Sequence, residues 1–110
     1  MFDSEQAVFY KHEENLLSGL RVQGKVALVT GGASGMGKAD ALLLAREGAS
    51  VVVADFNAEA GQETVALIKQ AGGNAIFVQG DVSKEEQVAA TIKAVIDNYG
   101  RLDIACNSAA

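Results

Sequence analysis

Two kinds of apolar segment alternate along residues 25–110. Short runs that are almost continuously apolar are typical of strands covered by helices on both faces, and these runs are 25–30, 50–55, 74–79 and 102–106. Between them, apolar residues return every three or four positions, the period of an amphipathic helix; the predicted helices are 35–47, 57–71 and 83–99. The alternation predicts βαβ units and a parallel sheet.

Polar residues and glycines mark the ends of the predicted helices. Ser83 and Glu86 have the spacing of a capping box, in which each side chain accepts a hydrogen bond from a free N–H at the helix start. Glycine often supplies the left-handed residue that ends a helix, and Gly48, Gly72 and Gly100 follow the three predicted helices. The pattern therefore predicts where each helix begins and ends.

Residues 1–24 precede this pattern and form a predicted N-terminal extension. Apolar residues at helical spacing, with Ser4 as a candidate cap, predict a short amphipathic helix there; they are Val8, Phe9, Leu16, Leu17 and Leu20. We interpret it as an accessory helix packed on its own domain or a frayed end, with docking of a partner as the alternative. Residues 25–110 then form the main domain.

The charge of the chain argues against nucleic acid as a partner. Fourteen Asp and Glu against nine Lys and Arg give a formal net charge of -5. A surface that binds a phosphate backbone needs the opposite sign. We therefore expect no nucleic-acid partner.

Cysteine, histidine and hydropathy restrict the chain further. With one cysteine, Cys106, and one histidine, His12, we expect neither an internal disulfide nor a Cys-rich or His-rich metal site. No apolar run approaches the ~18 residues that span a membrane, and the N-terminus is acidic, unlike a secretion signal. We expect a cytoplasmic protein with no metal site and no membrane contact.

A glycine-rich turn between the first predicted strand and helix carries the clearest chemistry. Gly31, Gly32, Gly35 and Gly37 fall within seven positions. Small residues let the backbone approach a pyrophosphate, and N–H groups at a helix start attract anions. The turn predicts a phosphate-bearing ligand; a turn without ligand is the alternative, disfavoured because glycines cost backbone entropy.

Two kinds of phosphate site fit this turn. Gly32 to Lys38 matches the G-x-x-x-x-G-K of a P-loop, but Ala39 stands where a P-loop NTPase needs a hydroxyl for Mg²⁺. In a dinucleotide site, Asp55 ends the second strand, where its carboxylate can accept hydrogen bonds from a ribose. The sequence favours the dinucleotide, and we interpret Lys38 as a solvated helix residue.

Four motifs together resemble the N-terminal part of the short-chain dehydrogenase/reductase family. They are Thr30-Gly31-x-x-x-Gly35-x-Gly37, Asp55, Asp81-Val82 and the segment 102–109, Leu-Asp-Ile-Ala-Cys-Asn-Ser-Ala. The resemblance covers residues 24–110. It implies a Rossmann-like, doubly wound α/β sheet, here of about four strands in the order 3-2-1-4, and an enzyme that transfers hydride between NAD or NADP and an alcohol or carbonyl group.

The resemblance also assigns roles to residues. The glycines would form the pyrophosphate turn, Asp55 would hold the ribose hydroxyls, Asp81 the adenine amino group, and Asn107 would lie near the cofactor. Asp81 has a plainer interpretation as a strand-end residue, and we place Asp103 on a solvated turn. The implied cofactor contacts are Gly31, Ser34, Gly35, Met36, Gly37, Asp55, Phe56, Asp81, Val82, Asn107 and Ala109.

Charge also predicts which dinucleotide binds. A carboxylate at Asp55 would repel a 2′-phosphate. Ser34, Phe56 and Asn57 stand where NADP-preferring relatives offer a cation, and all three are neutral. We expect NAD in preference to NADP.

The sequence departs from the family at its catalytic residues. The family uses a Tyr with a Lys four residues later, assisted by a Ser. Here Tyr10 and Tyr99 are followed at that spacing by Glu14 and Asp103. We expect no catalytic residue in this chain, which would be an incomplete fragment of an oxidoreductase and inactive alone; a non-enzymatic dinucleotide-binding or interaction module is the alternative.

The strand order predicts an exposed edge. The fourth strand would present unpaired N–H and C=O groups, which favour pairing with another chain. We expect self-association through this edge or through the N-terminal helix.

Overall fold

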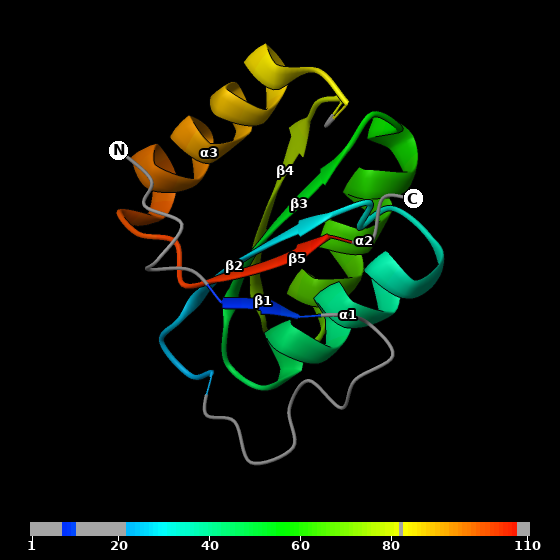
Figure 1. The fold of residues 1–110 in the computed structure, drawn as a ribbon. Helices are drawn as coiled ribbons and strands as arrows, with labels where there is room; N and C mark the ends of the chain where they lie inside the picture. Colours follow the sequence, from blue (N-terminus) through cyan, green and yellow to red (C-terminus); the bar gives the residue numbers. More distant parts are fainter. Residues whose placement is uncertain (1–7, 11–21, 82, 108–110) are drawn as a thin grey trace.

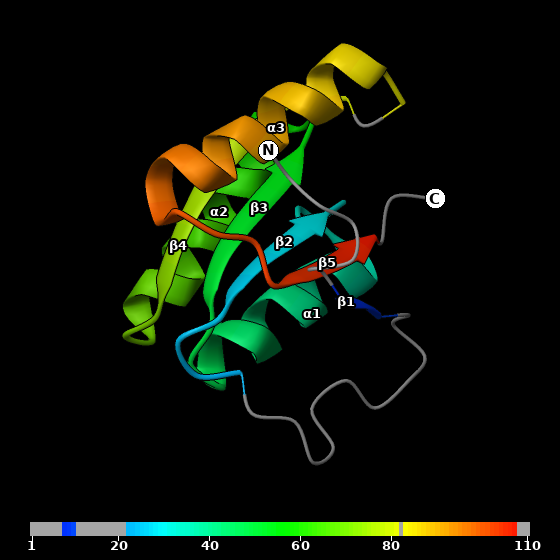
Figure 2. The same ribbon diagram turned by 60° about the vertical axis from the view of Figure 1, so that its left-hand side comes forward.

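The computed structural model describes residues 8–10, 22–81 and 83–107. It shows a parallel sheet with two helices on one face and a third helix on the other (Figures 1 and 2). In chain order the elements are β1 (Val8–Tyr10), β2 (Val26–Thr30), α1 (Gly35–Arg46), β3 (Ser50–Asp55), α2 (Ala58–Gln70), β4 (Asn74–Gln79), α3 (Glu85–Tyr99) and β5 (Ile104–Asn107).

The five strands lie in the order β1-β5-β2-β3-β4, and every pair is parallel. Apart from β1, this is the predicted order 3-2-1-4, so the expected α/β sheet is confirmed. The chain runs from β2 outward through β3 to β4, and then returns to place β5 on the other side of β2. The direction of winding therefore reverses between β2 and β5, which is where doubly wound sheets bind their ligands.

Alternate residues of the central strands fill two separate cores. On one face Val29, Val51 and Val53 pack with Leu44 of α1 and Ile68 of α2. On the other face, which α3 covers, the smaller cluster consists of Val26, Leu28, Val52, Ala54, Val95 and Leu102. Because both faces of each strand are buried, the strands appear in the sequence as continuous apolar runs.

The N-terminal extension differs from its prediction. Val8–Tyr10 form strand β1, so the amphipathic helix expected over Val8 and Phe9 is wrong there. The rest of the predicted helix lies outside the described residues. β1 pairs in parallel with β5, from Val8 beside Ile104 to Tyr10 beside Cys106. β5 is therefore not the exposed edge that we expected, because β1 pairs with its free N–H and C=O groups.

Asp103 joins two segments at the amino end of β2 and does not lie on the solvated turn that we predicted. Its carboxylate accepts hydrogen bonds from the Val26 N–H at 2.8 Å and from Arg101 Nη2 at 2.7 Å, and the side chain is 16% exposed. Burial alone would raise the pKa of Asp103, but the hydrogen bonds from Arg101 and Val26 outweigh it and hold the pKa below its ordinary value. Asp103 thus fixes the start of β2 beside the start of β5.

Candidate functional site

The residues predicted to bind cofactor gather at the carboxyl ends of the strands. Thr30, Asp55, Gln79 and Asn107 are the last residues of β2, β3, β4 and β5, and parallel strands place these ends at one edge of the sheet. The glycine-rich turn follows β2 and leads into α1. The structure therefore brings the glycine-rich turn, Asp55 and Asn107 to the same edge of the sheet.

Glycine is required in the turn for two physical reasons. Gly31 has a φ of 74°, in the left-handed region, and its N–H donates to the Ala54 carbonyl oxygen at 2.8 Å. At Gly37 the reason is space, because a Cβ there would lie 1.9 Å from the Gly31 carbonyl oxygen. The first turn of α1 thus packs directly on the backbone that precedes it.

Asp55 lies against the glycine-rich turn. Its Oδ2 accepts a hydrogen bond from the Ala33 N–H at 3.1 Å, and its Oδ1 accepts one from the Asn57 N–H at 3.0 Å. Both carboxylate oxygens are therefore held by backbone groups, one from the turn after β2 and one from the loop after β3. The arrangement places a fixed carboxylate beside the turn that is predicted to bind an anion.

The start of α1 is suited to an anion. Ser34 is the residue before the helix, no acidic residue occupies the first turn, and the Ser34 hydroxyl makes no capping hydrogen bond. The N–H groups of this turn and the positive end of the helix dipole favour a negatively charged group. Lys38, which we predicted to be a solvated helix residue, lies on α1 with its side chain partly exposed, and its Nζ is 3.7 Å from Glu63 Oε1 of α2.

Asp81 lies in the loop between β4 and α3. Its Oδ1 accepts hydrogen bonds from the Ser83 hydroxyl at 2.6 Å and from the Ser83 N–H at 2.9 Å, and these bonds lower the pKa of Asp81. The predicted capping box is wrong: α3 begins at Glu85 after Lys84, which makes no side-chain cap. The hydroxyl of Ser83 instead orients the Asp81 carboxylate.

Two predicted contact residues have apolar side chains open to solvent. Phe56 is 74% exposed and Met36 is 51% exposed. Phe56 directly follows Asp55, and Met36 lies in the first turn of α1. Their positions beside Asp55 and the glycine-rich turn are compatible with the predicted contacts. Val82 and Ala109, the other two apolar residues predicted to contact cofactor, lie outside the described residues.

Asn107 ends β5 directly beside Thr30 of β2. The Thr30 hydroxyl donates to Asn107 Oδ1 at 3.0 Å and lies 3.4 Å from the Cys106 carbonyl oxygen. This contact fixes the Asn107 side chain across the point where the winding reverses. The role of the Thr30 side chain was not predicted, although Thr30 stands in the glycine motif, because strand register is needed to pair it with Asn107.

The one cysteine, Cys106, directly precedes Asn107 in β5, and its side chain is buried. Cys106 Sγ lies 4.0 Å from Asp40 Oδ2 of α1, and burial together with the negative charge of Asp40 raises the pKa of the Cys106 thiol to about 11. A thiol with so high a pKa is a weak nucleophile. Cys106 is a core residue.

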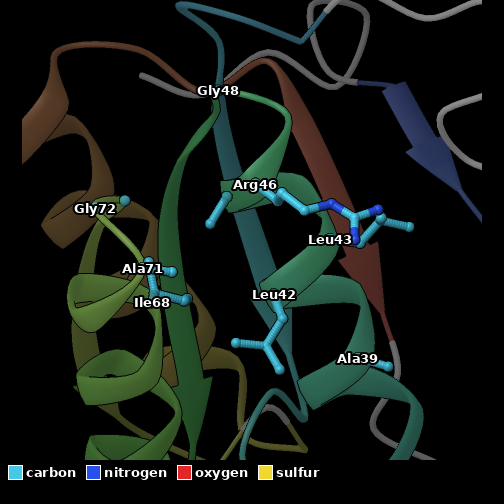
Figure 3. A pocket seen from close by; sticks show the side chains of 10 residues that line it. Ala39, Leu42, Leu43, Arg46, Gly48, Ile68, Ala71 and Gly72 are labelled. Atoms are coloured by element: carbon cyan, nitrogen blue, oxygen red, sulfur yellow. The ribbon is translucent and has the colours of Figure 1, made fainter.

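A separate hollow lies at the other end of the molecule. Its volume is about 710 Å³, and it lies between the carboxyl ends of α1 and α2, where Leu42 and Ile68 face each other (Figure 3). Gly48 and Gly73, at its rim, precede β3 and β4. The hollow is therefore at the amino ends of the strands and does not include the candidate site.

Neither a metal centre nor a membrane span occurs in the part of the chain that the structure describes. No group of three or more His, Cys, Asp and Glu side chains there could hold a metal ion. None of the helices there has the length and hydropathy needed to cross a bilayer.

The chain is similar to known dehydrogenases. The family model described as short chain dehydrogenase matches residues 25–110. The chain is 51% identical over 90 residues to the short chain dehydrogenase/reductase astE of Aspergillus oryzae, covering 81% of this chain and 34% of that protein. It is 43% identical over 91 residues to the short-chain dehydrogenase/reductase homolog YusS of Bacillus subtilis, and the match covers 82% of this chain and 84% of that protein.

A solved structure supports the same relation. The short chain dehydrogenase/reductase of Burkholderia phymatum, in complex with NAD, superposes with a TM-score of 0.76 and 36% identity, covering 78% of this chain and 31% of that one. The present chain thus spans about a third of the length of astE and of the Burkholderia protein.

Proposed function

Because the chain belongs to the short-chain dehydrogenase family, we propose that residues 25–110 bind the adenosine and pyrophosphate parts of NAD. The glycine-rich turn and the start of α1 would hold the pyrophosphate. Asp55 would accept hydrogen bonds from the ribose hydroxyls, while Phe56 and Asp81 would contact the adenine. Val82, Met36, Ser34, Asn107 and Ala109 complete the proposed contacts.

One observation carries this proposal more than any other. Asp55 Oδ2 accepts a hydrogen bond from Ala33 N–H within the glycine-rich turn. A ribose lies next to the pyrophosphate in a dinucleotide, so a site for it needs a carboxylate beside the anion-binding turn. The close approach of Gly37 to Gly31, which no side chain at position 37 would permit, fits the same cradle.

The fixed carboxylate supports NAD in preference to NADP. Because Ala33 and Asn57 hold both oxygens of Asp55, rotation of the side chain away from a 2′-phosphate would break two hydrogen bonds. The nearest cation in sequence to the turn, Lys38, pairs with Glu63. A 2′-phosphate would therefore lie beside the negative charge of Asp55.

Hydride transfer between the nicotinamide and an alcohol or carbonyl substrate is the reaction we propose for the complete site. In it, NAD would supply the hydride chemistry. The present residues would bind and orient the adenosine end. We propose that they hold the dinucleotide without catalysing its reduction, since Tyr10 and Tyr99 lack a lysine four residues later.

Calorimetric titration of the 110-residue chain with NADH, NADPH and ATP-Mg²⁺ tests the proposal. We expect NADH to bind more tightly than NADPH, and Asp55→Ala to weaken NADH binding about tenfold or more, because hydrogen bonds to a charged acceptor are worth about 1.5–3 kcal/mol. Tighter binding of ATP-Mg²⁺ than of NADH would contradict the proposal.

The P-loop alternative loses support from the position of Lys38. A P-loop lysine reaches the β- and γ-phosphates, whereas Lys38 Nζ points to Glu63 on α2. Ala39 also offers no oxygen for Mg²⁺. A non-enzymatic dinucleotide-binding module remains the second candidate, because the proposed contacts are to the adenosine end and neither Tyr10 nor Tyr99 has a lysine four residues later.

A further inference from the structure

Two glutamines hold the loops that surround the proposed adenine position. Gln79, the last residue of β4, donates from Nε2 to the Phe56 carbonyl oxygen at 3.0 Å. Gln87 of α3 accepts a hydrogen bond at Oε1 from the Asp81 N–H. Each glutamine thus binds the backbone of a proposed adenine contact and comes from a neighbouring element.

The Gln79 hydrogen bond adds to the pairing of β3 with β4. Phe56 is 74% exposed, so packing of its ring does not fix its position. The two strands pair as far as Asp55 and Gln79, and the Gly80 N–H donates to the Asp55 carbonyl oxygen at 3.1 Å. Gln79 extends this contact by one residue, because its side chain reaches the Phe56 carbonyl oxygen.

Gln87 has a comparable role on the other loop. Ser83 holds one oxygen of the Asp81 carboxylate, and Gln87 holds the Asp81 backbone, so the residue is fixed at both ends. Gln87 is half-buried near the start of α3. Through Val95, α3 packs against the sheet, so Gln87 connects the loop to an element of the core.

We propose that Gln79 and Gln87 are positioning residues for adenine recognition, with Gln79 fixing Phe56 and Gln87 fixing Asp81. The proposal rests on the proposed binding of NAD. Neither glutamine contacts the ligand in this scheme. Each restricts a loop before binding, which lowers the entropy lost when the adenine is bound.

The two glutamines differ in the direction of their hydrogen bonds, and this gives a matched test. Gln79 donates, so Gln79→Glu, which has nearly the same shape, places a carboxylate oxygen against the Phe56 carbonyl and removes the bond. Gln87 accepts, so Gln87→Glu keeps an oxygen for the Asp81 N–H. Methionine at either position removes the bond without adding charge, and Gln70→Met, on the exposed end of α2, is the control.

The experiment measures calorimetric affinities of the 110-residue chain for NADH and for reduced nicotinamide hypoxanthine dinucleotide, which has a carbonyl oxygen in place of the adenine amino group. Wild type is expected to prefer NADH about fivefold or more, because Asp81 is a charged acceptor for that amino group. Gln87→Met should reduce the preference to less than about twofold, and Gln87→Glu should retain it. Gln79→Met and Gln79→Glu should both weaken NADH binding at least about threefold, whereas Gln70→Met should not.

The ratio of the affinities for the two dinucleotides separates a positioning role from a merely structural one. A variant that only lowers stability would reduce the affinity for both dinucleotides equally. Urea denaturation of each variant measures its free energy of unfolding. If wild type binds NADH but Gln87→Met keeps the full preference, or Gln79→Met keeps full affinity, the positioning roles are wrong. If wild type does not bind NADH, the proposed function itself fails.

Discussion

The carboxyl edge of the sheet has two unlike sides. On the side of β3 and β4, hydrogen bonds to backbone and side-chain groups hold Asp55, Phe56 and Asp81 in place. On the side of β5, the Thr30 hydroxyl holds Asn107, which is the last residue that the structure describes. On the first side several held groups line the place where we propose that adenosine binds, and on the second the structure describes one held amide, that of Asn107.

This difference shows how local the proposed adenosine site is. All its fixed groups come from β2, β3, β4 and the loops that follow them, and their contacts are made within 25–110. We therefore propose that binding of adenosine and hydride transfer use different parts of the family's fold.

Gly37→Ala should have the largest effect on the ordered side. The new Cβ would lie 1.9 Å from the Gly31 carbonyl oxygen, so the turn must move. We expect a loss of about 1–3 kcal/mol in the free energy of unfolding and loss of measurable NADH binding, checked by urea denaturation and calorimetry.

Gly72→Ala is the matched control for Gly37→Ala. It has open space for a Cβ but a φ of 87°, so it should cost roughly 1 kcal/mol of stability and leave the NADH affinity unchanged. Equal loss of affinity in both variants would show that the effect at Gly37 is not local.

Asp55→Ala should reduce the NADH affinity about tenfold or more, because it removes a charged hydrogen-bond acceptor. It should also narrow the difference between NADH and NADPH, since the negative charge that opposes a 2′-phosphate is gone. Asp97→Ala, which removes an exposed partner of Lys93 on α3, is the control of equal charge. An unchanged ratio of the two affinities in Asp55→Ala would contradict the assignment of cofactor preference.

Asp103→Ala should act on stability and spare the site. It leaves the buried Val26 N–H without its 2.8 Å partner, which costs about 1–3 kcal/mol. Asp103 lies at the amino end of the sheet, so the NADH affinity of the folded protein should stay the same. A loss of affinity comparable to that in Asp55→Ala would show that the two ends of the sheet are coupled.

The low pKa of Asp103 also predicts a dependence on pH. A carboxyl whose folded pKa lies below its unfolded value of 3.8 stabilises the fold above pH 3.8, and the contribution is lost as the pH falls through the folded pKa. We expect wild type to lose more stability than Asp103→Asn between pH 6 and pH 3, measured by urea denaturation. Parallel losses would contradict the role of the ionised carboxylate.

Asn107→Ala should have the smallest effect. Because the β5 side is expected to add little to binding of the adenosine end, the NADH affinity should change by less than about twofold, which corresponds to less than about 0.4 kcal/mol. A loss as large as that in Asp55→Ala would show that the β5 side contributes binding energy of its own.

Features that depend on a local pattern of residues could be predicted from the sequence alone. Continuous apolar runs identified β2, β3 and β4, because strands covered on both faces leave no polar alternation. The glycine-rich turn and Asp55 were found by spacing, and the structure brings them into contact. The family and the parallel α/β order followed from the same motifs.

Features that depend on pairing across the fold were predicted wrongly or not at all. The apolar residues Val8 and Phe9 fitted a helix as well as a strand, and only the free edge of β5 decides between them. Ser83 and Glu86 have capping-box spacing, but Asp81 competes for the Ser83 hydroxyl. Gln79 and Gln87 carried no sequence signal, since their partners are backbone atoms in loops that the fold brings near.

We propose that the described residues bind the dinucleotide through its adenosine half. Calorimetric titration of the 110-residue chain with NADH, ADP-ribose and reduced nicotinamide mononucleotide separates the two halves of the ligand. We expect ADP-ribose to bind within about threefold of NADH and the mononucleotide to show no measurable binding, since threefold is only about 0.65 kcal/mol. A chain that binds the mononucleotide as tightly as ADP-ribose, or NADH far more tightly than ADP-ribose, would contradict it.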